Sequence, residues 1–515
     1  MEGFSKKVYL SLKMPTEDVP FSDQKRIQLA LNSLGYENVS MPLYVIRKLY
    51  PLCRDSGFDI TVSMVQRDHD WVITDIEAGD QTQNHYGLAV DYGSTTIVMR
   101  LIDMNSGAVV GEEKAVNGQT RFGTDILSRI TYSLESQANN DDLHSATVET
   151  FDSLLSQLTE ATGIDAGRCP AMILSGNTTM IHFLLKLNAW TVFASPYAPV
   201  TSDPGFFWGH EFGLNYGGMV YIIPAASNYV GGDIVSGLLK LDIHKSEKTS
   251  MFFDIGTNGE LVVGNRDWMI AGAGAAGPAL EGYISKFGMR AAPGTIDSVQ
   301  IHGVELSYTT IGNEKPLGIC GSGIIDLLAQ MRLHGWINIA GELIPHASNR
   351  IVYLEEEAQY AIVYAWAEES GIGAPLYFSQ TDIMQYLDTK AAAYTMVECL
   401  LDSAGAKEAD LEKLYLSGAF AAHSDLESAI TIGIFPDLPR DKYQVIGNTS
   451  LEGAQILLLD RSRLKEVQDL AGNMYCMQFA SIPDFLVRMQ AAKFIPHTDM
   501  SRYPSISYLL NNGNW

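Results

Sequence analysis

Clustered basic residues are what this sequence most clearly lacks. It carries 35 lysine and arginine residues against 60 aspartate and glutamate residues, a formal net charge of −25. Nucleic acids and anionic membrane surfaces are bound through clusters of positive side chains. The composition therefore argues against both classes of partner, and we expect a protein or small-molecule partner.

Long apolar runs and clustered cysteines are also missing. A helix that crosses a bilayer needs about 18 or more apolar residues in a row, and the sequence contains no such run. Its start, residues 1–7, also lacks the apolar core of a signal peptide. We therefore expect a cytoplasmic protein. The five cysteines lie far apart and never form a C-x-x-C pair, which predicts isolated core thiols and no cluster-ligating spacing: Cys53, Cys169, Cys320, Cys399 and Cys476.

The sequence does contain many apolar residues: 46% of its 515 residues are hydrophobic. A chain of this length and composition is expected to form two or three domains, each with its own core. The first eighty residues predict a small α/β unit. A strand at 8–12 is followed by a helix that Ser22 caps and Gly35 ends, and a hairpin pairs 60–65 with 71–76. A polar stretch at 79–84 is typical of a linker.

A strand-and-loop pattern then occurs twice. Residues 87–90 form a short apolar strand that runs into Asp91-Tyr92-Gly93-Ser94-Thr95-Thr96, and residues 251–253 run into Asp254-Ile255-Gly256-Thr257-Asn258-Gly259-Glu260. Each loop is followed by a second strand and a polar turn, and helical periodicity marks 148–158 and 391–401. The repeat predicts two similar α/β lobes.

The repeated loop has the chemistry of a phosphate site. A carboxylate at a strand tip, followed by a glycine turn, leaves backbone N–H groups and the hydroxyls of Ser94, Thr95 and Thr257 available to phosphate oxygens. Asp91 and Asp254 are the candidate ligands of Mg²⁺, through its waters. One such loop alone is more often a plain hairpin turn, but two copies favour a phosphate clamp.

Three further segments are candidates for contact with a nucleotide. The strand 414–416 breaks into Ser417-Gly418-Ala419-Phe420, where a nucleoside could lie against exposed backbone, although a strand-to-helix turn looks the same. Gly277 lies in a run of small residues that suits either close approach to a ligand or close packing. Gly321, Ser322 and Gly323 open a helix whose start could receive an anion or be only glycine-rich.

In this order, the elements resemble the superfamily of actin, sugar kinases and heat-shock chaperones. Finer strings resemble the reductive activators of corrinoid proteins over nearly the whole chain: Asn117-Gly118-Gln119, 122–126, 175–180, 254–260, 276–282 and 447–454. The resemblance implies an α/β, two-lobed actin-like ATPase fold of duplicated ribonuclease-H-like lobes with a small N-terminal α/β linker domain. We expect the linker domain at 1–83, the first lobe at 84–248 and the second at 249–515, which carries the adenosine motif.

The resemblance also implies a function, in anaerobic metabolism. Members of that family bind and hydrolyse ATP with Mg²⁺ while cob(II)alamin on a methyltransferase corrinoid protein is reduced to cob(I)alamin, and they suggest a homodimer. Their iron–sulfur cysteine cluster has no counterpart here, so we expect no iron–sulfur cluster and a separate low-potential electron donor. Ala419 stands where the adenosine motif usually has a second glycine.

The loop pattern and the family resemblance together predict the residues of the site. We expect the phosphates at Asp91, Gly93, Ser94, Thr95, Thr96, Asp254, Gly256, Thr257 and Asn258. Asp91, Asp254 or Glu260 would orient the attacking water, with Glu281 as a further rival. Alternatives are a small-molecule kinase of the same superfamily, an activator of the 2-hydroxyacyl-CoA dehydratase type, and a non-catalytic nucleotide-binding scaffold.

Overall fold

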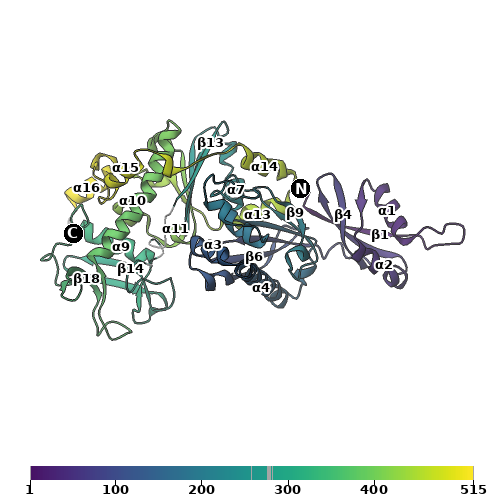
Figure 1. The fold of residues 1–515 in the computed structure, drawn as a ribbon, viewed down its shortest axis with the longest axis horizontal. Coiled ribbons are helices and arrows are strands. Elements are labelled where there is room, and N and C mark those ends of the chain that lie inside the picture. The colour runs from purple at the N-terminus through teal and green to yellow at the C-terminus, as the bar shows by residue number, and fades with distance from the viewer. Residues whose placement is uncertain (1, 257, 275–279, 281, 283, 514–515) are drawn as a thin grey trace. The chain divides into compact units, whose positions relative to one another are not determined.

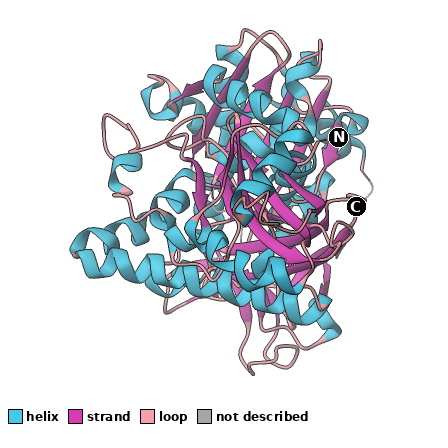
Figure 2. Ribbon diagram, turned by 90° about the vertical axis from the view of Figure 1, so that its right-hand side faces the viewer, coloured by secondary structure: helices cyan, strands magenta, loops and turns pink. Residues whose placement is uncertain are grey.

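The computed structural model describes residues 2–256, 258–274, 280, 282 and 284–513, and the chain forms two units (Figure 1). The first holds Met1–Asp242 and Thr449–Asn473, and the second holds Ile243–Asn448 and Met474–Trp515. Both units contain helices and strands, and Figure 2 shows the chain coloured by secondary structure. The chain thus passes from one unit to the other three times, after Asp242, Asn448 and Asn473.

The N-terminal residues form the small α/β domain that the sequence predicts. Ser22 caps α1 by accepting a hydrogen bond from Lys25 N, and the hairpin β3–β4 is antiparallel. Helices and strands pack around one apolar core that includes Ile27, Leu31 and Ile60. The sheet has the order β1-β3-β4-β2, and the elements are β1 (Ser5–Ser11), α1 (Asp23–Ser33), β2 (Val39–Ser40), α2 (Leu43–Asp55), β3 (Asp59–Arg67) and β4 (Asp70–Ala78).

This domain is joined to the rest of the first unit by specific contacts. Phe4 N donates to Leu458 O at 2.9 Å, and the Arg168 guanidinium pairs with Asp75 at 2.7 Å. Ser5 Oγ lies 2.8 Å from His85 Nε2, and burial lowers the pKa of His85 to about 4, so this ring is neutral at neutral pH.

The main sheet of the first unit has the order β7-β6-β5-β8-β10-β9. β5, β8 and β10 are parallel, whereas β6 and β7 extend β5 as an antiparallel meander. The elements are β5 (Tyr86–Tyr92), β6 (Thr96–Asp103), β7 (Val109–Val116), α3 (Ile126–Glu135), α4 (Gln137–Thr162), β8 (Ala171–Gly176), α5 (Thr178–Leu184), α6 (Trp190–Phe193), β9 (Gly205–Trp208), β10 (Met219–Ile222), α7 (Gly232–Leu241), α13 (Thr449–Leu459) and α14 (Leu464–Asn473).

The main sheet of the second unit repeats this topology. Its order is β21-β20-β11-β12-β13-β22, with β11, β20 and β21 parallel and β12 and β13 continuing as an antiparallel meander. Numbered by appearance, both sheets contain the run 3-2-1-4, and in both a further parallel strand pairs with strand 4. The strands are β11 (Ser250–Ile255), β12 (Gly259–Gly264), β13 (Met269–Gly274), β20 (Lys413–Ser417), β21 (Tyr443–Val445) and β22 (Tyr475–Met477). The predicted pair of α/β lobes is confirmed.

Two small sheets are inserted between β13 and the long helix α10, and the sequence did not predict them. β15-β14-β16 and β17-β18-β19 have three strands each. The strands are β14 (Thr295–His302), β15 (Glu305–Thr310), β16 (Gly318–Ile319), β17 (Ile351–Leu354), β18 (Gln359–Ala365) and β19 (Leu376–Ser379), and the helices of the unit are α9 (Gly321–Leu333), α10 (Gln380–Ser403), α11 (Ala419–His423), α12 (Leu426–Ile432), α15 (Phe485–Ala492) and α16 (Pro504–Asn512).

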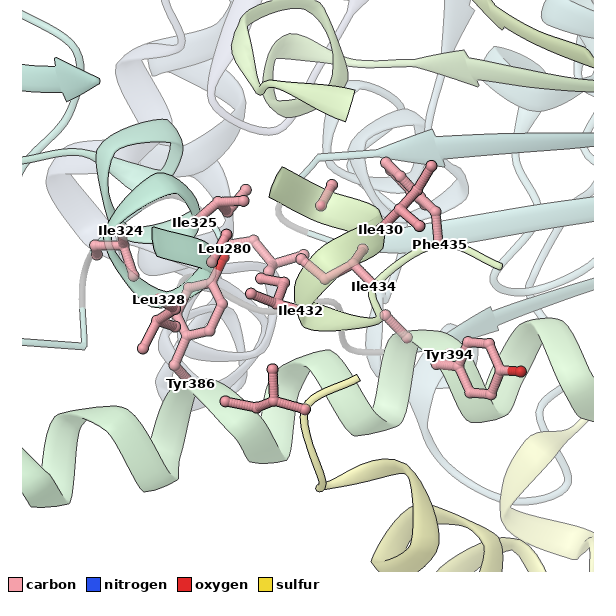
Figure 3. Packing of buried hydrophobic residues seen from close by; sticks show 14 of the residues in the cluster. Leu280, Ile324, Ile325, Leu328, Tyr386, Tyr394, Ile430, Ile432, Ile434 and Phe435 are labelled. Carbon is pink, nitrogen blue, oxygen red and sulfur yellow. The ribbon is translucent and has the colours of Figure 1, made fainter. Parts of the chain in front are cut away.

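The core of the second unit lies around α9, α10 and α12. Ile324, Ile325 and Leu328 of α9 pack with Tyr386 of α10 and Ile432 of α12 (Figure 3). This core fixes the helices behind the main sheet, so that the strand tips of β11 and β20 lie on a rigid support.

The cysteines and the helices test two expectations from composition. All five cysteines are free and four are buried, as predicted, but Cys476 is only half-buried because it lies on the edge strand β22. Among the described residues, none of the helices combines the length and the apolar character that crossing a bilayer requires.

Candidate functional site: two strand-tip loops

The first loop forms where β5 ends and β6 begins. Asp91, Ser94 and Thr95 are half-buried and Thr96 is exposed. A Cβ at Gly93 would lie 2.5 Å from Thr96 O, so only glycine fits this turn. The structure thus brings together the residues predicted for the first phosphate site, with a carboxylate, three hydroxyls and backbone groups on one tight turn.

Buried polar side chains hold this loop from behind. Asn117 Nδ2 donates to Gly93 O at 3.0 Å, and Arg129 Nη1 donates to Ser94 O at 2.6 Å. Gln119 Nε2 donates to the Tyr92 hydroxyl at 3.1 Å. Burial raises the pKa of Tyr92, so its hydroxyl stays protonated in this network. Three of these side chains, Asn117, Gln119 and Arg129, are completely buried.

The sequence pattern alone does not mark these supporting residues as part of the site. Asn117 and Gln119 lie in strings that carry the family resemblance, and Arg129 follows the second of them by three residues. These strings were the available signal, because a buried arginine 35 residues from Ser94 has no local pattern of its own.

Replacing Arg129 with methionine is expected to lower the free energy of unfolding by about 2–4 kcal/mol, because buried carbonyls lose a charged donor. Besides Ser94 O, Arg129 Nε donates to Gly123 O at 2.9 Å. Urea unfolding measures the change. Arg121→Met is the control, since its ion pair with Glu149 is exposed and is worth less than about 1 kcal/mol. Equal losses in the two variants would contradict the supporting role.

The second loop forms between β11 and β12. Asp254 is half-buried and pairs in register with Glu260 on one side and Ser417 on the other. Gly256 N donates to Asn258 O at 2.9 Å, which closes the turn. Asp254, Glu260 and Ser417, three residues predicted for the site, therefore stand in one row across three strands. Thr257 lies outside the described residues, as do Gly277 and Glu281.

The predicted adenosine motif lies directly against this second loop. Gly418 has a left-handed φ of +93°, and a Cβ there would overlap Ile255 O and lie 3.0 Å from Asp254 Oδ1. Ser417 Oγ donates to Gly447 O at 3.1 Å. Ala419 and Phe420 open α11, but their side chains lie outside the description. The backbone of Gly418 thus lies against the second loop, and the predicted contact of this motif with a nucleoside stays a prediction.

The third predicted segment, Gly321 to Gly323, forms the start of α9. Contacts within the protein explain why Ser322 and Gly323 stand there. Ser322 Oγ donates to Asp297 O at 2.9 Å. A Cβ at Gly323 would lie 2.6 Å from Ile296 O, so this glycine lets α9 approach β14. Gly321 is buried at the first position of the helix.

The duplication extends to a serine and a glycine on the fourth strand of each sheet. Leu174-Ser175-Gly176 ends β8 and Leu416-Ser417-Gly418 ends β20. Ser175 pairs with Asp91 as Ser417 pairs with Asp254. Ser175 Oγ donates to Gly232 O at 3.1 Å, the same kind of bond that Ser417 Oγ makes. This repeated tripeptide was the signal that could have identified Ser175.

Both loops fit phosphate and a magnesium ion. Each provides a half-buried carboxylate at a strand tip, and at Gly93 and Gly418 the backbone lies too close to a neighbouring carbonyl oxygen for any Cβ to fit. Hard oxygen ligands and backbone N–H groups are what Mg²⁺ and phosphate require.

Three family models match successive parts of the chain. Residues 1–83 match the RACo linker region and residues 86–246 the RACo middle region. Residues 248–507, half of the chain, match the C-terminal domain of RACo, the ASKHA domain. The chain belongs to the RACo family. The resemblance to reductive activators of corrinoid proteins and the actin-like fold are both confirmed.

Named relatives of this RACo-family chain agree. A solved structure, the reductive activator for corrinoid, iron-sulfur protein, is 34% identical, with a TM-score of 0.86 over 98% of this chain and 81% of that one. The corrinoid activation enzyme RamQ of Eubacterium limosum is 32% identical over 76% of this chain and 67% of its own length. The Methanosarcina barkeri reductase of the Co(II) methylated amine-specific corrinoid protein is 27% identical over 75% of this chain and 72% of its own.

Proposed function

We propose that this RACo-family protein binds and hydrolyses ATP to assist the reductive reactivation of a corrinoid protein of a methyltransferase system. Its relatives are named for corrinoid activation and corrinoid reduction. The proposal that the protein binds a nucleotide rests on the duplicated strand tip. Asp91 pairs with Ser175 near the end of one strand, and Asp254 pairs with Ser417 near the end of the matching strand.

The chain's own residues contribute positioning and electrostatics. Backbone N–H groups and the hydroxyls of Ser94, Thr95 and Thr257 would donate to phosphate oxygens, and Asp91 and Asp254 would hold Mg²⁺. The bound ion would supply positive charge that neutralises the phosphates. Asp254, Asp91 or Glu260 orients the attacking water. The backbone at Gly418 lies along the nucleoside.

The redox step balances as two separate reactions. ATP and water give ADP and phosphate, while cobalt accepts one electron and passes from Co(II) to Co(I). The electron comes from a separate low-potential donor such as a ferredoxin-like protein. ATP acts by changing which state of the corrinoid protein binds most tightly, because a ligand shifts an equilibrium only through differential affinity.

The test is ATP hydrolysis by the purified protein, with and without corrinoid proteins from methyltransferase systems. We expect turnover that requires Mg²⁺ and rises several-fold with the correct corrinoid protein. Phosphoryl transfer that depends on a small-molecule acceptor would establish a kinase instead. ATP that binds but is not hydrolysed, even with a corrinoid protein, would establish a nucleotide-binding scaffold.

A further inference from the structure

The start of α13 makes an unassigned contact with the first loop. Ser450, the second residue of α13, is 5% exposed. Its Oγ donates to Asp91 Oδ1 at 2.8 Å, across 359 residues of sequence. It also lies 2.9 Å from Ser175 Oγ. The string 447–454 carries the family resemblance, but sequence alone gives no reason for a serine at this position.

The direction of the hydrogen bonds follows from counting protons. An ionised carboxylate only accepts, so the single hydroxyl proton of Ser450 must go to Asp91. Ser175 is then the donor in both of its hydrogen bonds, to Ser450 Oγ at 2.9 Å and to Gly232 O at 3.1 Å, and its one proton is shared between them. The hydroxyl protons of Ser175 and Ser450 therefore both have acceptors, and the chain of hydrogen bonds ends at the Asp91 carboxylate.

Ser450 is itself held in place. Ser236 Oγ of α7 donates to Ser450 O at 2.6 Å. At the other end of α13, Leu458 O accepts from Phe4 N at 2.9 Å. Just beyond the helix, Arg461 Nη2 donates to Asp68 O at 2.9 Å. These contacts fix α13 at both ends within the first unit, so the backbone of Ser450 keeps its place beside Asp91.

We propose that Ser450 is a positioning residue that sets the orientation in which Asp91 meets the metal-bound nucleotide. This inference rests on the proposed nucleotide site. A charge-assisted hydrogen bond in a buried site is strong enough to fix one rotamer. Without it, the Asp91 carboxylate loses the donor that lies on its Oδ1, and the metal loses affinity while the loop, held by Asn117 and Arg129, keeps its backbone.

The test compares Ser450→Ala with Ser5→Ala as a matched control. Ser5 is also a buried serine with a side-chain hydrogen bond, to His85, but His85 precedes β5 whereas Asp91 lies near its far end. Two quantities are measured: the Mg²⁺ concentration for half-maximal ATP turnover, and the affinity of the protein–ATP complex for Mn²⁺ by electron paramagnetic resonance. Urea unfolding verifies that both variants fold.

We expect Ser450→Ala to weaken both metal responses about tenfold, the worth of one charged hydrogen bond, and Ser5→Ala to leave them unchanged. Unchanged metal responses in Ser450→Ala, or an equal change in Ser5→Ala, would overturn the inference. If the wild-type protein binds Mn²⁺ with ATP and Ser450→Ala binds it more weakly, but neither hydrolyses ATP, positioning stands and the proposed hydrolysis fails.

Discussion

Asp254→Asn is expected to reduce Mg²⁺-dependent ATP turnover at least about 100-fold while the protein stays folded. The substitution keeps the size of the side chain and removes only its charge. Loss of a charged group that acts on the transferring phosphoryl region costs this much in related catalytic sites. Because Asp254 is half-buried at a strand tip, it contributes little to packing. Turnover at saturating ATP and Mg²⁺, with a circular dichroism spectrum, measures both effects.

The matched control for this prediction is Asp267→Asn. Asp267 lies in the exposed turn after β12, at the opposite end of that strand from Glu260, where its carboxylate is 3.7 Å from Arg266 Nε. We expect wild-type turnover from this variant. Wild-type turnover by Asp254→Asn, or equal loss in both variants, would show that the Asp254 loop is not the phosphate site.

Gly418→Ala is expected to have the second largest effect, lowering the free energy of unfolding by at least about 2 kcal/mol. Two causes add. The left-handed φ of +93° is strained for alanine, and the new methyl group would overlap the Ile255 carbonyl oxygen, a backbone atom that cannot swing away. Relief of the overlap must push β20 and the Asp254 loop apart, so ATP binding, measured by titration calorimetry, should also weaken.

Gly405→Ala separates these two causes. Gly405 also has a left-handed φ, of +63°, but nothing lies within 4 Å of the Cβ position. Strain alone should cost this variant about 1 kcal/mol and leave ATP binding unchanged. If Gly418→Ala were no more harmful than Gly405→Ala, the close approach of the adenosine motif to the second loop would be wrong.

The elements that the sequence predicted are those with short-range signals. Ser22 caps its helix because its hydroxyl accepts a hydrogen bond from the backbone N–H three residues later. Asp91 and Asp254 come directly after runs of apolar strand residues. Such patterns need only a few neighbouring residues. The repeat of the strand-and-loop pattern predicted two similar lobes, and the repeated sheet topology agrees with it.

What the sequence could not supply are contacts between distant segments. Ser450 meets Asp91 across 359 residues, and no periodicity relates the two. The same holds for α13 as a whole, which follows β21 of the second unit in sequence but belongs to the first unit. The two inserted sheets also depend on such contacts, since β16 has only two residues and is defined by its pairing with β14.

The most direct test of the proposed function follows the oxidation state of cobalt. A corrinoid protein in the Co(II) state is mixed under anaerobic conditions with this protein and a low-potential reductant, and its absorbance spectrum is recorded before and after Mg²⁺-ATP is added. We expect Co(I) to form only after ATP is added, and not with Asp254→Asn. Co(I) formation that proceeds equally without nucleotide, or its absence while ATP is hydrolysed, would contradict an ATP-dependent role in corrinoid reactivation.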